Sequence, residues 1–424
     1  MIIRPLGEAE TLLALLHEHA RGTPQTVQVV TIEGNIDRGL FLSALKHVFE
    51  CYPILGARFL KTATGYDLIA DVSFETIPVC LAQEEIHSEW LREILEQEAN
   101  DPLPQDKYLW RATLVSSKKK AVSDQYIVLT VHHAICDGQS IKVFFDVLLA
   151  YFNNPEIPRS LFKVPEPLEK FYVSSRKASS CHLKELDALH RYQPPFQTSA
   201  PMGARKTRFK ISFLTNEDVA ALECISKKQG VFLNAVLSAA ALLASQEMFG
   251  VLGEEELTVD LPSMVNLRQA TEGQISENDI GYFCALVTLV LEKVSNKTGL
   301  FVLAKRIAGQ LGRRTCSLTL SPYTDDHSEL EKHLGFLWDV RRKNFCSNVL
   351  VSNVGFLHFD ETGIYKIKNI RGSVSLGNGQ YPIGVFIVGT KNGMSIIYNY
   401  CEPLISGEQA QQFIDNFNHF LNCI

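Results

Sequence analysis

Residues 131–138 read Val-His-His-Ala-Ile-Cys-Asp-Gly, which places two histidines, an aspartate and a glycine close together in the chain. The residues before them, 125–130, are mostly β-branched, aromatic or apolar and predict a buried strand. The residues after them, 140–151, repeat large apolar side chains at helical spacing and predict a helix. The motif is therefore expected on a strand-to-helix loop, where rigid scaffolds commonly display reactive side chains.

The sequence on either side of this loop alternates between helical and strand patterns. Upstream, helical patterns fall at 8–19, 37–52 and 84–99, and strand patterns at 26–33, 55–69, 72–79, 109–116 and 125–131. Downstream, strand patterns fall at 208–214, 257–262, 280–291, 349–357 and 383–400, and helical patterns at 216–228, 233–249, 300–311 and from 406 onward. This alternation predicts an α/β fold in which helices cover mixed sheets.

A segment punctuated by prolines separates the two halves. Residues 153–207 contain seven prolines and a serine-rich run at 174–180, with a helical pattern only at 182–192. Composition of this kind is typical of connections between domains. We therefore predict an N-terminal lobe at 1–152, an interdomain connection at 153–207 and a C-terminal lobe at 208–424.

Composition and charge narrow the class of protein. An apolar share of 46% with 21% charged residues over 424 positions is ordinary for a soluble globular chain. The 41 basic and 47 acidic residues give a net charge of −6 without a strongly basic block, which argues against a nucleic-acid partner. We expect a two-lobed monomer.

Cysteine usage and the apolar segments bear on location. Ten cysteines occur without a CxxC pair or zinc-ligand spacing, so we expect reduced thiols in a cytosolic protein. Glu8 and Glu10 interrupt the N-terminal apolar run, which lacks the shape of a signal peptide. Residues 233–252 are the most apolar later segment, but polar residues interrupt them, and a membrane span needs about 20 mostly apolar residues. We therefore expect a cytoplasmic protein without a membrane span.

Several kinds of site can be weighed against the motif. Adjacent residues of an extended chain point to opposite faces, so His132 and His133 are not expected to share a metal ion. The sequence has no G-x-S-x-G elbow, no P-loop and no G-x-G-x-x-G. Cys136 follows an apolar strand and is more often a small buried hydrophobe than a nucleophile.

A lone general base fits the motif best. One histidine can face a channel while its neighbour points into the fold. Asp137 can hold the loop by accepting hydrogen bonds, and Gly138 lets the chain turn tightly. The alternative is a buried histidine–aspartate pair that only fixes a turn.

The motif resembles a known family signature. Residues 132–138 are similar to the HHxxxDG motif of the CoA-dependent acyltransferase superfamily, which includes chloramphenicol acetyltransferase, plant BAHD acyltransferases, peptide condensation domains, and polyketide-associated and alcohol acyltransferases. Further segments that resemble family signatures, in order along the chain, are 4–10, 44–45, 52–55, 109–112, 264–268, 280–283 and 351–355. The opening segment is most similar to the polyketide-associated and alcohol acyltransferase branch. The DFGWG motif of the plant branch is absent, the nearest stretch being 377–379, so that branch is not expected.

The resemblance implies a fold and a mechanism. It implies two chloramphenicol-acetyltransferase-like lobes, each a mixed sheet with helices, and an active-site tunnel between them. A thioester donor would enter from one side and an alcohol or amine from the other. His133 would act as the general base, without a covalent intermediate, because the thioester is already activated. Asp137 would be structural, and His132 would be a packed, supporting neighbour.

Other roles depend on positions that the resemblance does not assign uniquely. Ser352 and Asn353 are candidate donors to the oxyanion, or else strand-end residues that bond the backbone. Condensation domains carry an arginine that pairs with the motif aspartate, and Gly56 stands at that position here. The remaining candidates for the pairing arginine are Arg58, Arg111 and Arg268. Arg268 could instead bind the phosphate of the donor or brace the tunnel floor.

These inferences predict an O-acyltransferase of secondary metabolism or lipid assembly. Its co-substrate would be an acyl-CoA or an acyl-carrier-protein thioester, its partners a small-molecule alcohol or amine acceptor and an acyl carrier protein, and no cofactor or metal would be bound. One alternative is an amide-forming condensation enzyme. Another is a catalytically silent module that docks carrier proteins, although the intact His133, Asp137 and Gly138 argue against it.

Overall fold

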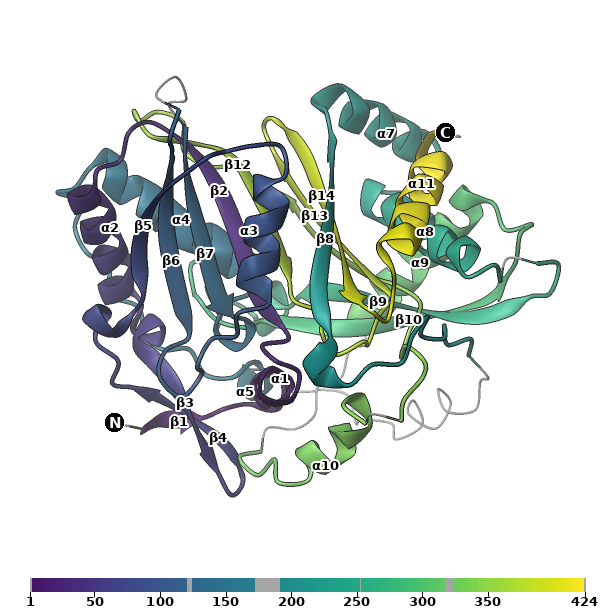
Figure 1. Ribbon diagram of the computed structural model, residues 1–424, viewed down its shortest axis with the longest axis horizontal. Coiled ribbons are helices and arrows are strands. Elements are labelled where there is room, and N and C mark those ends of the chain that lie inside the picture. The colour runs from purple at the N-terminus through teal and green to yellow at the C-terminus, as the bar shows by residue number, and fades with distance from the viewer. Residues whose placement is uncertain are drawn as a thin grey trace.

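Two sheet-containing lobes make up the chain (Figure 1). The structure is a computed structural model that describes residues 2–119, 124–171, 191–251, 253–316, 324–339 and 341–422. The N-terminal lobe has a five-stranded sheet in the order β12 (Lys366–Val374), β2 (Gln25–Glu33), β7 (Asp124–His132), β6 (Trp110–Ser117) and β5 (Val79–Glu84). A small sheet beside it has the order β1 (Ile2–Pro5), β4 (Gly65–Ala70) and β3 (Ala57–Thr62). The predicted α/β fold with two lobes is confirmed.

Helices cover both faces of the five-stranded sheet. One face of the sheet packs against α1 (Glu8–His19), α2 (Arg38–Cys51) and α4 (Gly138–Asn153), and together they form the larger hydrophobic core of this lobe. The opposite face carries Val27, Val29 and Val128, which pack against α3 (Trp90–Ala99). This division follows from the sequence, because alternate residues of a strand point to opposite faces.

The C-terminal lobe is built on a six-stranded sheet. Its order is β10 (Cys284–Val294), β9 (Leu257–Asn266), β11 (Leu350–Phe356), β13 (Ile383–Thr390), β14 (Gly393–Glu402) and β8 (Lys206–Leu214). Its helices are α7 (Asn216–Lys228), α8 (Leu233–Met248), α9 (Leu300–Cys316) and α11 (Gly407–Asn422). Two short helices, α5 (Leu168–Phe171) and α10 (Leu330–Leu334), lie in the segments that connect the larger elements. α8 is buried along most of its length, as its mixed apolar and small-residue sequence predicts.

The two lobes do not divide the chain at a single point. β12 comes from the second half of the sequence, yet it pairs antiparallel with β2 and completes the sheet of the N-terminal lobe. Ile370 stands opposite Val30 in this pairing. The predicted C-terminal lobe at 208–424 is therefore wrong over β12. No strand was predicted at 366–374, and a local pattern does not say which sheet a strand joins.

Other expectations differ from the structure or lie outside it. The strand predicted at 72–79 is wrong, because a 3-10 turn covers Phe74–Thr76 and β5 begins only at Val79. Residues 84–89 were predicted to be helical, but β5 continues to Glu84 through parallel pairing with β6, and α3 begins only at Trp90. The helix predicted at 182–192 lies almost entirely outside the described residues. Among the described helices, none alone is long and apolar enough to cross a membrane; only α7 and α8, bent by 97° to each other, meet the length and composition as a pair.

Candidate active site

The His-His-Asp-Gly loop lies where the sequence predicts it. β7 ends at His132, a single 3-10 turn covers His133–Ile135, and Asp137 caps the N-terminus of α4. His132 is held opposite Gln25 of β2, so the end of a central strand fixes the position of the loop. The strand-to-helix loop is confirmed.

The ring of His133 is held in one tautomer. Its Nδ1 lies 2.9 Å from the carbonyl oxygen of Cys136, which can only accept a hydrogen bond. Nδ1 therefore carries the proton, and Nε2 keeps its lone pair. The ring of Tyr282 stands edge-on to His133 at a centroid distance of 5.3 Å. Burial lowers the pKa of His133, an effect that the bond to Cys136 opposes.

His132 points into the protein instead. It is fully buried, and its Nδ1 accepts a hydrogen bond of 3.2 Å from the amide of Ala134. Its Nε2 lies 3.1 Å from Oε1 of Gln105, to which it donates, and its ring packs against those of His17 and Phe59. Burial lowers the pKa of His132 far below its usual value, so the ring is a neutral packed neighbour of His133.

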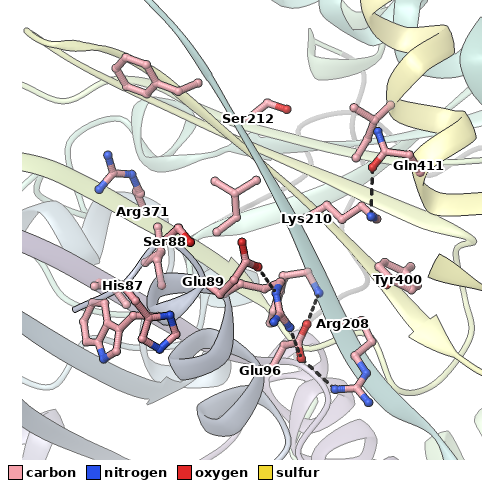
Figure 2. A pocket seen from close by; sticks show the side chains of 18 of the residues that line it. His87, Ser88, Glu89, Glu96, Arg208, Lys210, Ser212, Arg371, Tyr400 and Gln411 are labelled. Atoms are coloured by element: carbon pink, nitrogen blue, oxygen red, sulfur yellow. Dashed lines mark hydrogen bonds and ion pairs between the residues drawn. The ribbon is translucent and has the colours of Figure 1, made fainter. Parts of the chain in front are cut away.

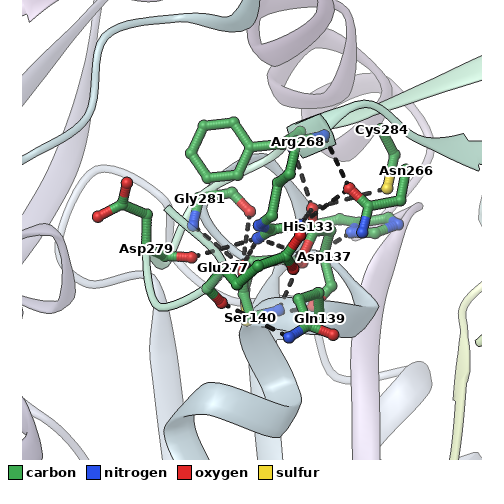
Figure 3. A network of polar contacts seen from close by, with 12 residues as sticks. His133, Asp137, Gln139, Ser140, Asn266, Arg268, Glu277, Asp279, Gly281 and Cys284 are labelled. Atoms are coloured by element: carbon green, nitrogen blue, oxygen red, sulfur yellow. Dashed lines mark hydrogen bonds and ion pairs between the residues drawn. The ribbon is translucent and has the colours of Figure 1, made fainter. Parts of the chain in front are cut away.

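Asp137 forms a buried ion pair with Arg268 (Figure 3). The two amino nitrogens of Arg268 lie 2.8 Å and 3.0 Å from the two carboxylate oxygens of Asp137. The side chains are only 0% and 1% exposed. This bidentate pair joins the motif loop to the 3-10 turn Arg268–Thr271 that follows β9.

The remaining hydrogen-bonding capacity of Asp137 is used by the backbone and by Ser140. Its carboxylate accepts bonds of 2.9 Å from the amide of Ser140 and 3.0 Å from the amide of Phe283, and the Ser140 hydroxyl lies 2.9 Å away. Burial alone would raise the pKa of Asp137, but Arg268 and these bonds hold it below its usual value. The carboxylate is thus anchored away from the ring of His133, which fits a structural role and not a proton relay.

The pairing identifies which arginine accompanies the motif aspartate. Arg58 pairs with Asp71 on the surface, and Arg111 pairs with Glu98, which leaves Arg268 as the partner of Asp137. The expectation that Arg268 binds substrate does not fit this position, because its guanidinium is enclosed and engaged by Asp137. Arg268 is instead a brace beneath the loop.

A narrow cavity of about 90 Å³ lies at the seam between the lobes, beside His133. Apolar side chains form most of its wall, namely Ile141, Met264, Val354, Leu357, Ile370, Val374, Phe386, Ile387 and Val388. Cavities that hold small molecules are typically about 300–1,000 Å³. A substrate chain can therefore occupy this cleft only if side chains or lobes move apart.

Ser352 and Asn353 lie on opposite faces of β11. Ser352 lines the cleft together with His133. Asn353 turns away, where its amide nitrogen donates to Oδ1 of Asn234 at 3.2 Å and its oxygen accepts from the amide of Gly355 at 2.8 Å. Alternation along a strand explains the split. Asn353 fits the backbone-bonding alternative, and Ser352 alone keeps the position expected of an oxyanion donor.

Gly138 serves a purpose other than the one expected. Its φ is not positive, so a tight turn does not require glycine there. A Cβ at this position would lie 3.0 Å from a methyl group of Val354, on a strand of the other lobe. Gly138 therefore permits close approach between the start of α4 and β11.

Replacing Gly138 by alanine is expected to lower the free energy of unfolding by about 1–3 kcal/mol, the usual effect of overpacking. Chemical denaturation of Gly138→Ala measures this loss. The double variant Gly138→Ala with Val354→Ala should recover part of it, because the smaller side chain removes the clash. Equal loss in the single and double variants would show that contact with Val354 is not the reason for glycine.

Several supporting residues were missed from the sequence. The Ser140 hydroxyl lies within 3.1 Å of Asp137, Gly281 and Arg268 together, and Tyr282 orients the ring of His133. The spacing of Asp137 and Ser140 is typical of a helix N-cap, and this pattern could have indicated the contact between their side chains. Gly281 and Tyr282 lie in the segment 280–283 that resembles a family signature, but their contacts with the motif loop were not predicted, because these join segments about 140 residues apart.

Comparisons with known proteins agree with this architecture. Residues 203–359 match the family model described as the phthiocerol/phthiodiolone dimycocerosyl transferase C-terminus. A stretch of 154 residues, 36% of the chain, is 27% identical to HC-toxin synthetase of Cochliobolus carbonum, and this match spans only 3% of the length of that synthetase.

Similar solved structures cover nearly the whole chain. Polyketide synthase associated protein 5 from Mycobacterium tuberculosis superposes with a TM-score of 0.72 at 16% identity, covering 99% of this chain and 98% of that one. The first condensation domain of the calcium-dependent antibiotic synthetase gives 0.76 at 15% identity over 99% and 95%. TRI3 trichothecene 15-O-acetyltransferase from Fusarium sporotrichioides gives 0.74 at 13% identity over 99% and 94%. The fold is that of these condensation-domain and acyltransferase structures, as the predicted resemblance implies.

Proposed function

We propose that this chain is an acyltransferase that moves an acyl group from a thioester to an alcohol, with Nε2 of His133 as the general base. The observation that carries the proposal is the fixed tautomer of His133 in a cleft that both lobes line. Nε2 can accept a proton only because Nδ1–H is committed to the carbonyl of Cys136. The similarity to acyl- and acetyltransferases supports the same reaction class.

The reaction follows from these positions. The alcohol oxygen attacks the thioester carbonyl while Nε2 of His133 takes its proton, which gives a tetrahedral oxyanion and an imidazolium. The hydroxyl of Ser352 is the candidate donor to that oxyanion. The C–S bond then breaks, and the imidazolium returns the proton to the departing thiolate, so that the products are an ester and a thiol.

Direct transfer is favoured over a cysteine intermediate. Cys136 is buried, and burial together with the charge of Asp137 raises the pKa of its thiol well above the usual value. Burial acts in the same direction on the pKa of Cys284, which lies on the cleft wall. Both sulfurs therefore remain protonated near neutral pH and are poor nucleophiles.

The experiment that tests the function is thiol release from a panel of acyl-CoAs and acyl-carrier-protein thioesters, each with alcohols or amines as acceptors. Release that depends on an alcohol and yields one equivalent of ester supports the proposal. Release that depends only on amines would replace it by amide formation. No acceptor-dependent release from either class of donor would contradict an enzymatic role and favour a docking module.

The pH dependence of the reaction is a further prediction. Burial lowers the pKa of His133 below the ordinary value of about 6.5, so its neutral, proton-accepting form persists to more acidic pH. Activity should therefore be retained at pH 6.5 and be lost only as the pH falls through the lowered pKa. A profile of kcat/KM against pH measures this. An acidic limb above pH 6.5 would contradict a buried base at His133.

A further inference from the structure

A second, larger cavity lies apart from the cleft that contains His133. It is a groove of about 940 Å³ between α3 of the N-terminal lobe and β8, the edge strand of the six-stranded sheet (Figures 1 and 2). The two cavities share no lining residue. They lie on opposite faces of β12, since Ile370 and Gly372 line the cleft and Arg371 lines the groove.

Half of the free edge of β8 is capped by α3. β8 pairs with β14 in unbroken register, and the backbone groups of its odd-numbered residues face away from that partner. The amide of Thr207 donates to Asn100 at 2.9 Å and its carbonyl accepts from the same side chain at 2.8 Å. The amide of Phe209 donates to Glu96 at 3.2 Å. These bonds satisfy the first part of the edge.

The rest of the edge is open toward the groove. The outward amides and carbonyls of Ile211 and Phe213 have no hydrogen-bond partner within the part of the chain that the structure describes. Phe213 is 43% exposed. An uncapped edge strand with an exposed aromatic residue is a template for pairing with a further strand.

Two cations that line the groove, Lys210 and Arg371, have no carboxylate partner among the described residues. The other two cations that line it, Arg92 and Arg208, do form ion pairs, with Glu89, Glu96 and Glu402. Within the part of the chain that the structure describes, Lys210 donates only to the side-chain amide oxygen of Gln411, at 3.0 Å. Arg371 projects from β12 on the opposite wall, and no ion pair or hydrogen bond of its guanidinium is found among the described residues (Figure 2). Burial lowers the pKa of Arg371, which reflects loss of water around this unpaired cation.

We infer that this groove receives an extended acidic peptide segment of a partner protein, added as a strand to the open edge of β8. The backbone of the peptide would bond Ile211 and Phe213, and a carboxylate side chain would meet Arg371 or Lys210. A second copy of this chain is disfavoured as the occupant, because residues of α3 and β12 flank the edge and a strand inside a folded sheet would have to pass between them.

A labelled hexapeptide of alternating valine and glutamate is the probe. Fluorescence polarisation should show binding to the full chain, and hydrogen exchange should slow at the amides of Ile211 and Phe213. A peptide with lysine in place of glutamate should bind at least about tenfold more weakly. A probe whose alternate amides are N-methylated on the pairing edge should also lose binding.

Two variants separate the backbone and charge contributions. Ile211→Pro removes one outward amide without removing a bond to β14, and Arg371→Gln removes the unpaired charge. Arg371→Gln should keep the unfolding midpoint of the wild type, and both variants should weaken the glutamate probe by about tenfold or more; Arg371→Lys should weaken it less. Failure of the probe to bind, binding that leaves exchange at Ile211 and Phe213 unchanged, or concentration-dependent protection of these amides in the free protein would each overturn the inference.

Discussion

Replacing His133 by alanine is expected to lower acceptor-dependent thiol release by about 10²-fold or more, the usual contribution of a positioned general base. The reason is geometric. His133 is the histidine of the motif that lines the cleft, and its bond to Cys136 leaves Nε2 as the proton acceptor. His132 cannot replace it, because its ring is enclosed and its nitrogens bond Ala134 and Gln105.

A matched control comes from the same loop. Gln139 lies at the start of α4 and does not line the cleft, and its side chain makes one long contact among the described residues, of 3.5 Å to the carbonyl of Glu277. Gln139→Ala should therefore retain activity within a few-fold of the wild type. Equal unfolding midpoints of the two variants would show that any difference in rate is chemical. A His133→Ala protein as active as Gln139→Ala would contradict the general-base role.

Breaking the buried pair of Asp137 and Arg268 is expected to have the largest effect on stability. Arg268→Met leaves the Asp137 carboxylate enclosed without its counter-ion, a change that usually costs about 3–5 kcal/mol of unfolding free energy. Guanidinium denaturation measures the loss. The double variant Asp137→Asn with Arg268→Met should recover part of it, because no uncompensated charge then remains.

The chain offers a surface pair as the control. Arg58 and Asp71 form a bidentate pair of similar geometry, with distances of 2.7 Å and 2.9 Å, but the two side chains are 28% and 41% exposed. Water screens this pair, so Arg58→Met should cost less than about 1 kcal/mol. Similar losses of unfolding free energy for Arg58→Met and Arg268→Met would show that burial does not increase the contribution of the Asp137–Arg268 pair.

The same pair sets a pH window for stability. The folded pKa of Asp137 lies below its unfolded value, so its contribution is fully present above the unfolded pKa and disappears as the pH falls through the folded one. Arg268→Met should raise the folded pKa of Asp137, because Arg268 no longer opposes the effect of burial, and the acid-induced loss of stability should therefore shrink. Denaturation at a series of acidic pH values would detect that change.

The sequence predicted those parts of the site that are local. The loop between a strand and a helix, the packed position of His132 and the position of His133 all follow from residues within one short stretch, where periodicity and motif spacing are informative. The boundaries of α1 and α7 were likewise predicted, because apolar periodicity and terminal residues coincide there.

What the sequence could not supply are contacts between distant segments. Three arginines were equal candidates for pairing with Asp137, and only the turn after β9 carries Arg268 to it. The assignment of β12 to the N-terminal sheet and the role of Gly138 against Val354 have the same origin. In each case the contacting residue lies more than 100 residues away in the sequence, so local periodicity does not predict the contact.

Single-turnover mass spectrometry tests the central claim most directly. The protein would be mixed with one equivalent of an acyl thioester that it accepts, first alone and then with excess alcohol, and both the intact protein and the small molecules would be weighed. Direct transfer through His133 predicts no added acyl mass on the protein, and ester and thiol in equal amounts only when alcohol is present. An acyl adduct on the wild-type protein, or the same ester yield from His133→Ala, would contradict it.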